Sequence, residues 1–141
     1  GTVLSTLQAQ QACDSGCRAI VSPGFSLKIA EYCKRGNLPY LPGVCTPTEI
    51  HTALDVGLDL LKFFPAEQTG GMQALSTYSA VFQQVRFMPT GGISTDNVVE
   101  YLKQKNVLCC GGTWLSPERL MMEDEWEEIE RRVVSALQLI S

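Results

Sequence analysis

Short apolar runs alternate with longer segments of mixed apolar and polar residues along the 141 positions of the chain. The runs recur at intervals of about 20 to 25 residues, close to the length of one strand followed by one helix. Short runs of this kind, bounded by turn-forming residues, are typical of strands. The pattern predicts strands at Ala19–Ser22, Tyr40–Pro42, Leu60–Phe64, Val85–Met88 and Val107–Cys110.

Helical patterns fill the intervals between the runs and extend to the end of the chain. One helix is expected to begin at Thr46, because Thr46 suits the N-cap, Pro47 suits the first helical position and Glu49 completes a capping box. The other helices are expected at Phe25–Gly36, Gly70–Phe82, Ser94–Lys105 and Asp124–Ile140.

Each predicted strand ends in residues that favour turns. These residues are Pro23-Gly24, Pro42-Gly43, Pro65-Ala66, Pro89-Thr90-Gly91-Gly92 and Gly111-Gly112. Strands that alternate with helices form parallel sheets with right-handed crossovers, as in a doubly wound open sheet or a (β/α)8 barrel. The turn residues favour the barrel, where functional residues collect in the loops that follow the strands.

The length of the chain limits both architectures. A complete (β/α)8 barrel needs roughly 200 residues or more, whereas the sequence provides five complete strand–helix units and a strand-like start, Gly1-Thr2-Val3-Leu4. We therefore expect an α/β domain over residues 1–141 that is either an open sheet or a barrel with part of it missing.

The composition limits the classes of function that the chain can have. Apolar residues make up 45% and charged residues 18% of the chain, with a net charge of −4 and a pI near 4.9. This balance indicates a soluble globular domain and argues against a nucleic-acid surface. No apolar run approaches the length of about 20 residues that spans a membrane. The six cysteines lack the spacing of a metal site, and we expect reduced, buried thiols in a cytoplasmic protein.

Lys62 is the most unusual charged residue, because it lies in the apolar run Leu58–Phe64. In a strand, Leu60, Lys62 and Phe64 share one face while Leu61 and Phe63 share the other. Both faces are covered in a barrel, so we expect Lys62 to point inward near the end of its strand.

Burial of an amine has a chemical consequence. Desolvation disfavours the ammonium form and lowers its pKa, and a neutral amine attacks carbonyl carbon to give a Schiff base that acts as an electron sink. This is the chemistry of a class I aldolase. Alternatively, Lys62 extends to solvent or pairs with Asp59 or Glu67, in which case it is structural. The local sequence leaves both interpretations open.

Two glycine pairs follow the last two predicted strands, at Gly91-Gly92 and Gly111-Gly112. Glycine lets backbone N–H groups approach an anion closely, and a following helix N-terminus adds a favourable dipole. Barrels commonly bind phosphate at the loops after their last two strands. We therefore expect a phosphate site here, with Thr90 and Thr113 as further donors; the alternative is that the glycines only form tight turns.

Six segments, read in order, closely resemble one family. They are SPGF, LPGVCTPTE, LKFFPAE, GG, VRFMPTGGIS and VLCCGGTWL. The resemblance is to 2-keto-3-deoxy-6-phosphogluconate (KDPG) aldolase and its relatives that handle 4-hydroxy-2-oxoglutarate and 6-phosphogalactonate analogues. It extends from Gly1 to about Pro117 and through the C-terminal helix, and KFFPAE together with PTGGIS is highly specific.

The resemblance implies a (β/α)8 barrel that assembles as a homotrimer. It also implies cleavage of KDPG to pyruvate and glyceraldehyde 3-phosphate without a metal or another cofactor. By the same resemblance, Lys62 is the Schiff-base lysine, Thr2 helps to hold the pyruvate carboxylate, and Pro23 and Phe64 line the site. The residues that match the phosphate-binding loops are Thr90, Gly91, Gly92, Gly111, Gly112 and Thr113.

The resemblance further implies a glutamate that shuttles protons and an arginine that binds the substrate carboxylate, in a segment like EVTLRT that precedes GTVL. That segment is not among these 141 residues. We therefore expect the chain to be the C-terminal portion of a barrel domain without its first strands. Its own function is then a weakened aldolase, a non-catalytic phosphosugar-binding fragment, or an inert fragment.

Overall fold

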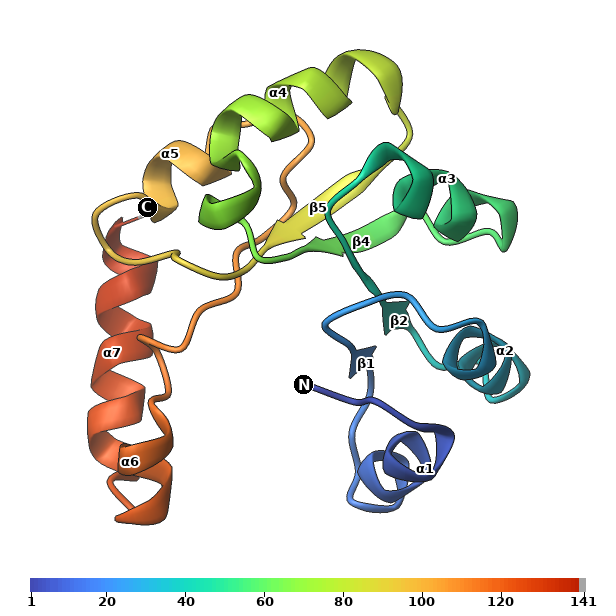
Figure 1. Cartoon of the computed structure of the whole chain (residues 1–141). Coiled ribbons are helices and arrows are strands. Elements are labelled where there is room, and N and C mark those ends of the chain that lie inside the picture. Colours follow the sequence, from blue (N-terminus) through green and yellow to red (C-terminus); the bar gives the residue numbers. More distant parts are fainter. Residues whose placement is uncertain (140–141) are drawn as a thin grey trace.

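A computed structural model of the chain describes residues 1–139 (Figure 1). The strands are β1 (Ile20–Val21), β2 (Tyr40–Leu41), β3 (Gly43–Val44), β4 (Leu60–Phe63) and β5 (Arg86–Pro89). The helices are α1 (Thr6–Asp14), α2 (Leu27–Arg35), α3 (Pro47–Asp55), α4 (Gly71–Val81), α5 (Val98–Leu102), α6 (Glu118–Met122) and α7 (Trp126–Leu139), with a short 3-10 helix, η1 (Glu67–Thr69).

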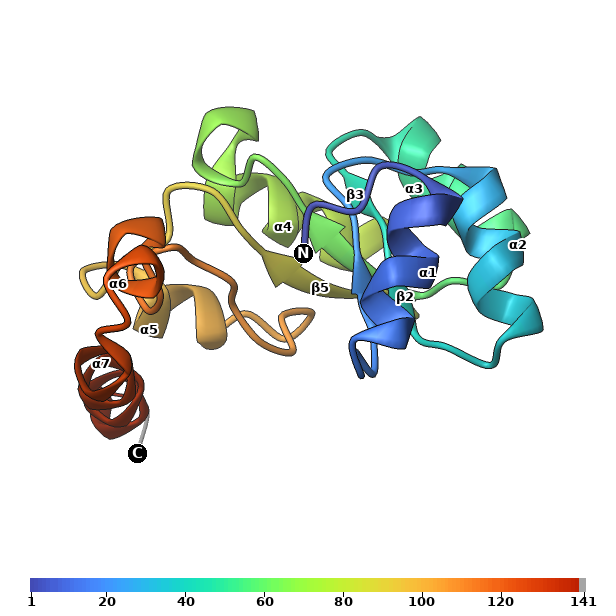
Figure 2. The same ribbon diagram turned by 90° about the horizontal axis from the view of Figure 1, so that it is seen from below.

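All strand pairs are parallel, as predicted. β1 pairs with β2, and β4 lies between β3 and β5. The spatial order follows the order along the chain, with no reversal of the kind that defines a doubly wound sheet. Figure 2 shows the strands from a second direction. Within residues 1–139 the strands do not close into a complete barrel.

The prediction of a turn at Pro42-Gly43 is wrong. The chain continues through Pro42 directly into β3, so β2 and β3 form one path that joins the two sheets. Proline has no N–H to donate to a neighbouring strand, which interrupts the ladder. Its carbonyl still accepts a hydrogen bond of 2.8 Å from the Lys62 N–H.

The start of the chain and the segment Val107–Cys110, which flank the strands, form fewer hydrogen bonds with their neighbours than the central strands do. Val3 donates its N–H to the Val21 carbonyl at 3.1 Å, which agrees with a strand-like start to the chain. The predicted strand Val107–Cys110 is wrong, because this segment forms only one isolated bridge, from Val107 to Phe87, and a second bridge, from Gly111 to Thr90, follows it. Within residues 1–139 no strand pairs with the other edge of the segment Val107–Cys110. The segment therefore does not become part of a regular strand ladder.

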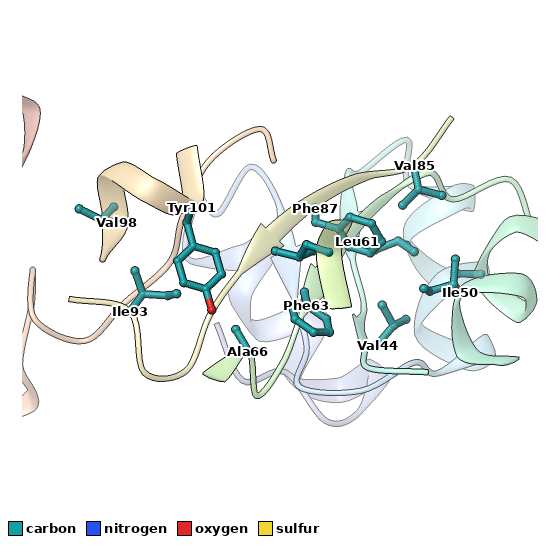
Figure 3. Packing of buried hydrophobic residues seen from close by; sticks show 12 residues of the cluster. Val44, Ile50, Leu61, Phe63, Ala66, Val85, Phe87, Ile93, Val98 and Tyr101 are labelled. Atoms are coloured by element: carbon teal, nitrogen blue, oxygen red, sulfur yellow. The ribbon is translucent and has the colours of Figure 1, made fainter. Parts of the chain in front are cut away.

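The main core lies between the strands and the helices α3, α4 and α5, which lie on one side of the strands in Figure 1. Leu61 and Phe63 of β4 are fully buried there, as the alternation predicts (Figure 3). The Phe63 ring meets the Phe87 ring edge to face, with 6.2 Å between centroids. A second cluster packs β1 and β2 against α1 and α2. The buried face of β4 therefore leaves Lys62 on the opposite face.

The predicted helices are present with some differences in extent, whereas α1 and α6 were not predicted from the sequence. The capping box of α3 is present, with Thr46 and Glu49 in the predicted roles. Helix α5 begins only at Val98, because the preceding residues form a turn in which the Ser94 N–H donates to Asn97 Oδ1 at 2.9 Å. The segment predicted as Asp124–Ile140 forms α7 from Trp126, and Ile140 lies outside the described residues.

The cysteines are all unpaired, but the prediction that they are buried is only partly right. Cys33 is buried, whereas Cys17 and Cys109 are exposed. The remaining three, Cys13, Cys45 and Cys110, are half-buried. No helix in the described part of the chain is long and apolar enough to cross a bilayer.

Candidate functional site

Lys62 lies in the middle of the parallel sheet. It is in register with Gly43 of β3 and with Met88 of β5. Its side chain is on the face opposite the Leu61 and Phe63 core, as the alternation predicts, and only 8% of the residue is exposed. The strand order therefore places an amine on the face of the sheet opposite the main core, with neighbouring strands on both sides.

The amine of Lys62 has an apolar environment. Its nitrogen lies 4.5 Å from the centroid of the Phe64 ring. It forms no hydrogen bond or ion pair with any residue in the described range 1–139. Burial lowers the pKa of Lys62 from the ordinary value, because the charged form loses its hydration. An unpaired, desolvated amine is suited to nucleophilic attack on a carbonyl carbon.

The alternative in which Lys62 pairs with a nearby carboxylate is wrong. Neither Asp59 nor Glu67 forms an ion pair with it. Glu67 instead accepts a short hydrogen bond from the hydroxyl of Tyr101, a residue that is fully buried. Burial and this carboxylate raise the pKa of the Tyr101 hydroxyl. Glu67 therefore has a structural partner, and Lys62 has none among the carboxylates.

Gly43 is part of the site, although the sequence pattern predicted only a turn residue there. A Cβ at Gly43 would overlap the carbonyl of Pro23, so the loop after β1 crosses directly over β3. Paired residues of parallel strands project to the same face, which brings this crossing to the face that carries Lys62. The sequence feature that could have indicated Gly43 as a site residue is its position directly after the predicted strand Tyr40–Pro42.

The loops after β4 and β5 are joined by backbone hydrogen bonds. The Ala66 N–H donates to the Thr90 carbonyl at 2.8 Å, and the Glu67 N–H donates to the Gly91 carbonyl at 3.1 Å. Gly91 and Gly92 have φ values of 98° and 80°, in the left-handed region that favours glycine. These bonds hold the segment that follows Lys62 against the predicted phosphate loop.

The second glycine pair lies against the first. The Gly111 N–H donates to the Pro89 carbonyl at 2.9 Å, and a Cβ at Gly111 would lie 2.7 Å from Thr90 Oγ1. At Gly112 a Cβ would overlap the ring of Trp114. Close packing therefore explains both glycines, whether or not an anion binds beside them.

The predicted site residues fall into two groups. The loops after β4 and β5 and the segment 111–113 meet at one end of the sheet, and they include half-buried Thr90 and exposed Thr113. Thr2 and Pro23 belong to the other group, beside the end of β1. Thr2 is exposed and has a φ of 64°, just before the hydrogen bond from Val3 to Val21. The path through Gly43 connects the two groups across the sheet.

Metal ligands do not gather at this site. Within residues 1–139 there is no group of three or more His, Cys, Asp or Glu side chains arranged to hold a metal ion. The only histidine of the sequence, His51, lies on the exposed surface of α3 and faces Asp55 at 3.8 Å. Within residues 1–139, no hydrogen bond or ion pair joins either residue to Lys62.

Together, the fold and the site define a parallel α/β protein of the barrel type, with an unpaired lysine on a central strand. Comparison with known proteins identifies the family. A family model for KDPG and KHG aldolase matches residues 1–132. The chain therefore belongs to the KDPG and KHG aldolase family.

Two relatives and one solved structure support this assignment. The 2-dehydro-3-deoxy-phosphogluconate aldolase of Treponema pallidum is 39% identical over 140 residues, covering 99% of this chain and 67% of the relative. The protein of the same name from Haemophilus influenzae is 39% identical, covering 99% and 66%. The crystal structure of KDPG aldolase from Legionella pneumophila, with pyruvate captured as a covalent carbinolamine, matches with a TM-score of 0.89 and 36% identity, covering 96% and 66%. The chain thus spans about two thirds of the length of these proteins.

Proposed function

We propose that this chain carries the Schiff-base lysine of a class I aldolase that cleaves KDPG to pyruvate and glyceraldehyde 3-phosphate. The observation that carries the proposal is Lys62, a buried amine on a central strand that has a lowered pKa and no ion-pair partner among the described residues. Membership of the family supports the reaction class. The covalent carbinolamine named for the Legionella pneumophila relative is the adduct that an amine forms with a keto acid.

The proposed reaction begins at the nitrogen of Lys62. The neutral amine adds to the C2 carbonyl of the keto acid, and loss of water from the carbinolamine leaves a protonated imine. The imine accepts the electron pair of the C3–C4 bond as that bond breaks. The C4 hydroxyl releases its proton, the aldehyde product leaves, and an enamine remains on Lys62.

The second half of the reaction restores the enzyme. C3 of the enamine takes up a proton, and water hydrolyses the resulting imine to pyruvate and free lysine. The proton released at C4 balances the proton taken up at C3, so the cleavage needs no oxidant, reductant or metal. Burial around the amine disfavours the ammonium form, and the Phe64 ring, whose centroid lies 4.5 Å from the nitrogen, offsets only part of that cost.

Substrate binding is proposed for the two groups of residues that flank Lys62. Backbone N–H groups at Gly91, Gly92 and Gly112, with the hydroxyls of Thr90 and Thr113, are proposed to bind the phosphate. Gly111, whose own N–H donates to the Pro89 carbonyl, is proposed to let the loop approach the phosphate closely. This assignment is supported by the hydrogen bonds that bring the two loops together at the end of β5. In the second group, Thr2 is proposed to contact the pyruvate carboxylate, and Pro23 to line the site with Phe64.

The proposal extends to the domain and its assembly. Residues 1–141 are proposed to form the C-terminal portion of a barrel domain, in line with the sheet that stays open within residues 1–139. The intact domain is proposed to act as a homotrimer. Cross-linking and light scattering of the complete domain test the oligomeric state, and a monomer at working concentrations contradicts this part of the proposal.

Reductive trapping tests the proposed chemistry directly. The chain is incubated with pyruvate and borohydride, then measured by intact mass and peptide mapping, with Lys62→Met as the matched variant and the Haemophilus influenzae relative as the working control. We expect one reduced pyruvyl adduct, confined to the peptide that contains Lys62. Absence of the adduct, while the control forms it, contradicts catalysis by this chain.

A second measurement separates catalysis from simple binding. If inorganic phosphate raises the melting temperature while no adduct forms, the chain is a phosphate-binding fragment rather than an aldolase. If neither effect occurs and unfolding is broad and non-cooperative, the chain is an inert fragment. Cleavage of KDPG, followed by coupled detection of pyruvate, establishes the complete activity.

A further inference from the structure

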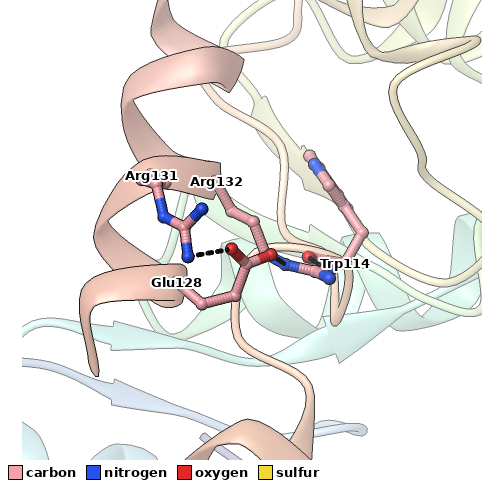
Figure 4. A network of polar contacts seen from close by, with 4 residues as sticks. All are labelled: Trp114, Glu128, Arg131 and Arg132. Carbon is pink, nitrogen blue, oxygen red and sulfur yellow. Dashed lines mark hydrogen bonds and ion pairs between the residues drawn. The ribbon is translucent and has the colours of Figure 1, made fainter. Parts of the chain in front are cut away.

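A polar network joins helix α7 to the segment that follows the second glycine pair (Figure 4). Arg132 donates from Nη1 to the backbone carbonyl of Trp114 at 3.0 Å and from Nε to Glu128 Oε1 at 2.7 Å. Glu128 Oε2 pairs with Arg131 Nη2 at 3.0 Å. The spacing of three and four residues places all three side chains on one face of α7. Arg132 is therefore the member of this network that reaches outside the helix.

The Trp114 ring in turn lies directly on Gly112. A Cβ at Gly112 would overlap the six-membered part of the indole, so no side chain fits between the ring and the backbone. The indole Nε1 is buried and has no hydrogen-bond partner in the described part of the chain. The position of the ring thus depends on packing and on the backbone of Trp114, whose carbonyl accepts the hydrogen bond from Arg132.

On its other side, the glycine loop is held by the end of β5. The Gly111 N–H donates to the Pro89 carbonyl, and the space that a Cβ of Gly111 would occupy lies 2.7 Å from Thr90 Oγ1. The loop from Gly111 to Thr113 is thereby enclosed between the strand end and the Trp114 ring. A shift of Trp114 removes one of these two supports.

We propose that Arg132 is a positioning residue that holds the Trp114 ring on Gly112 and so fixes the Gly111–Thr113 loop in the geometry that binds the substrate phosphate. This inference rests on the phosphate site of the proposed function. Glu128 acts in the same unit, because its carboxylate orients the guanidinium group toward Trp114. The hydrogen bonds from Arg132 lower the pKa of Glu128, which therefore stays charged at neutral pH.

The neighbouring Arg131 provides a matched control. Its side chain is 74% exposed and its ion pair within residues 1–139 is with Glu128, whereas the Arg132 side chain is 38% exposed and binds both Glu128 and Trp114. Exposed ion pairs of this kind contribute little to stability. Arg131→Ala therefore removes the same charge from the same helix and leaves the bond to Trp114 in place.

Tryptophan fluorescence measures the position of the ring without requiring activity. The chain contains two tryptophans, so a Trp126→Phe background leaves Trp114 as the reporter. In this background we compare Arg132→Ala, Arg132→Lys and Arg131→Ala. Acrylamide quenching reports access to the Trp114 ring, inorganic phosphate titration reports the loop, and pyruvate trapping reports Lys62.

We expect Arg132→Ala to increase quenching of Trp114 and to raise the Kd for phosphate by roughly fivefold, the equivalent of about 1 kcal/mol for a lost hydrogen bond. Arg132→Lys restores part of the affinity, because an ammonium group still donates to the Trp114 carbonyl. Arg131→Ala matches the background in both measurements. Pyruvate trapping at Lys62 stays within about twofold in all variants, since pyruvate has no phosphate; this figure reflects the scatter of near-neutral surface substitutions.

Other outcomes overturn the inference. Equal quenching and equal phosphate affinity in Arg132→Ala and Arg131→Ala show that Arg132 does not position the loop. Increased quenching with unchanged phosphate affinity shows that the ring moves but does not support an anion site. If the background chain binds no phosphate while pyruvate still traps on Lys62, the phosphate site is wrong, and with it this inference, although the Schiff-base lysine is retained.

Discussion

Replacing Lys62 with methionine is expected to abolish the pyruvyl adduct and, at the same time, to stabilise the fold. The lysine is 8% exposed and has no ion-pair or hydrogen-bond partner within residues 1–139. Methionine is an unbranched, flexible and uncharged side chain that adapts to irregular apolar surroundings. The substitution therefore removes a desolvated charge without leaving a cavity.

The expected magnitude follows from two opposing contributions. Burying a polar group without a hydrogen bond costs about 1–3 kcal/mol in protein mutational data. The cation–π contact with Phe64, which methionine cannot form, offsets about 0.5–1 kcal/mol of this cost. The variant is thus expected to gain about 0–2.5 kcal/mol in the free energy of unfolding, with a central value of about 1 kcal/mol. For a chain of this size each kcal/mol raises the melting temperature by roughly 2–4 °C.

The gain should depend on pH. Burial lowers the pKa of folded Lys62 below its ordinary value of 10.5, so between these two pKa values the unfolded chain binds more protons than the folded chain. Wild-type stability then rises with pH across that interval. The penalty is complete below the folded pKa and disappears above 10.5. Lys62→Met has no such group, and its advantage over the wild type should close as the pH rises.

Thermal unfolding monitored by circular dichroism at several pH values between neutrality and 10.5 measures this advantage. Lys28→Met, on the exposed surface of α2, is the control for exchanging a solvated lysine. We expect the control to change stability by no more than about 0.5 kcal/mol. A Lys62→Met variant that is less stable than the wild type, or whose advantage is the same at every pH, refutes the assignment of Lys62 as a desolvated, unpaired amine.

Three further substitutions test the surroundings of the site by urea unfolding. Thr46→Ala removes the N-cap and capping box of α3 and should cost about 1 kcal/mol, while Thr46→Ser should restore most of the loss. Tyr101→Phe removes the hydrogen bond to Glu67 and should cost about 0.5–1.5 kcal/mol; an unchanged midpoint contradicts a role for this bond. Gly43→Ala places a methyl group against the Pro23 carbonyl and should cost about 1–3 kcal/mol, and a neutral effect would show that the crossing loop moves freely.

The features predicted correctly from the sequence are those that depend on local periodicity. Alternation along β4 gave the correct face for Lys62, because Leu61 and Phe63 are buried on the opposite side. The capping box of α3 was predicted from four adjacent residues, since all of its hydrogen bonds join near neighbours. The family was evident from motifs that occur in order, and the match over residues 1–132 confirms it.

The features that sequence patterns missed depend on contacts between distant segments. Proline followed by glycine usually signals a turn, but Gly43 continues the strand because the Pro23 loop needs the space above it. Likewise, the run Val107–Cys110 has the composition of a strand, yet a ladder also requires neighbours in register, and β5 provides such a neighbour only at the isolated bridge from Phe87 to Val107. Neither condition is visible in a short window of sequence.

The glycines and the lysine differ in how strongly each supports a function. Gly111 and Gly112 are explained by the close approach of Thr90 and of the Trp114 ring, so these glycines would be needed even if no anion bound. Lys62 has no comparable structural explanation, because it stabilises no carboxylate and its burial carries a cost. A residue that costs stability where an apolar side chain would fit is best explained by chemistry. The proposed aldolase function therefore rests on Lys62, and the phosphate site requires its own test through Arg132.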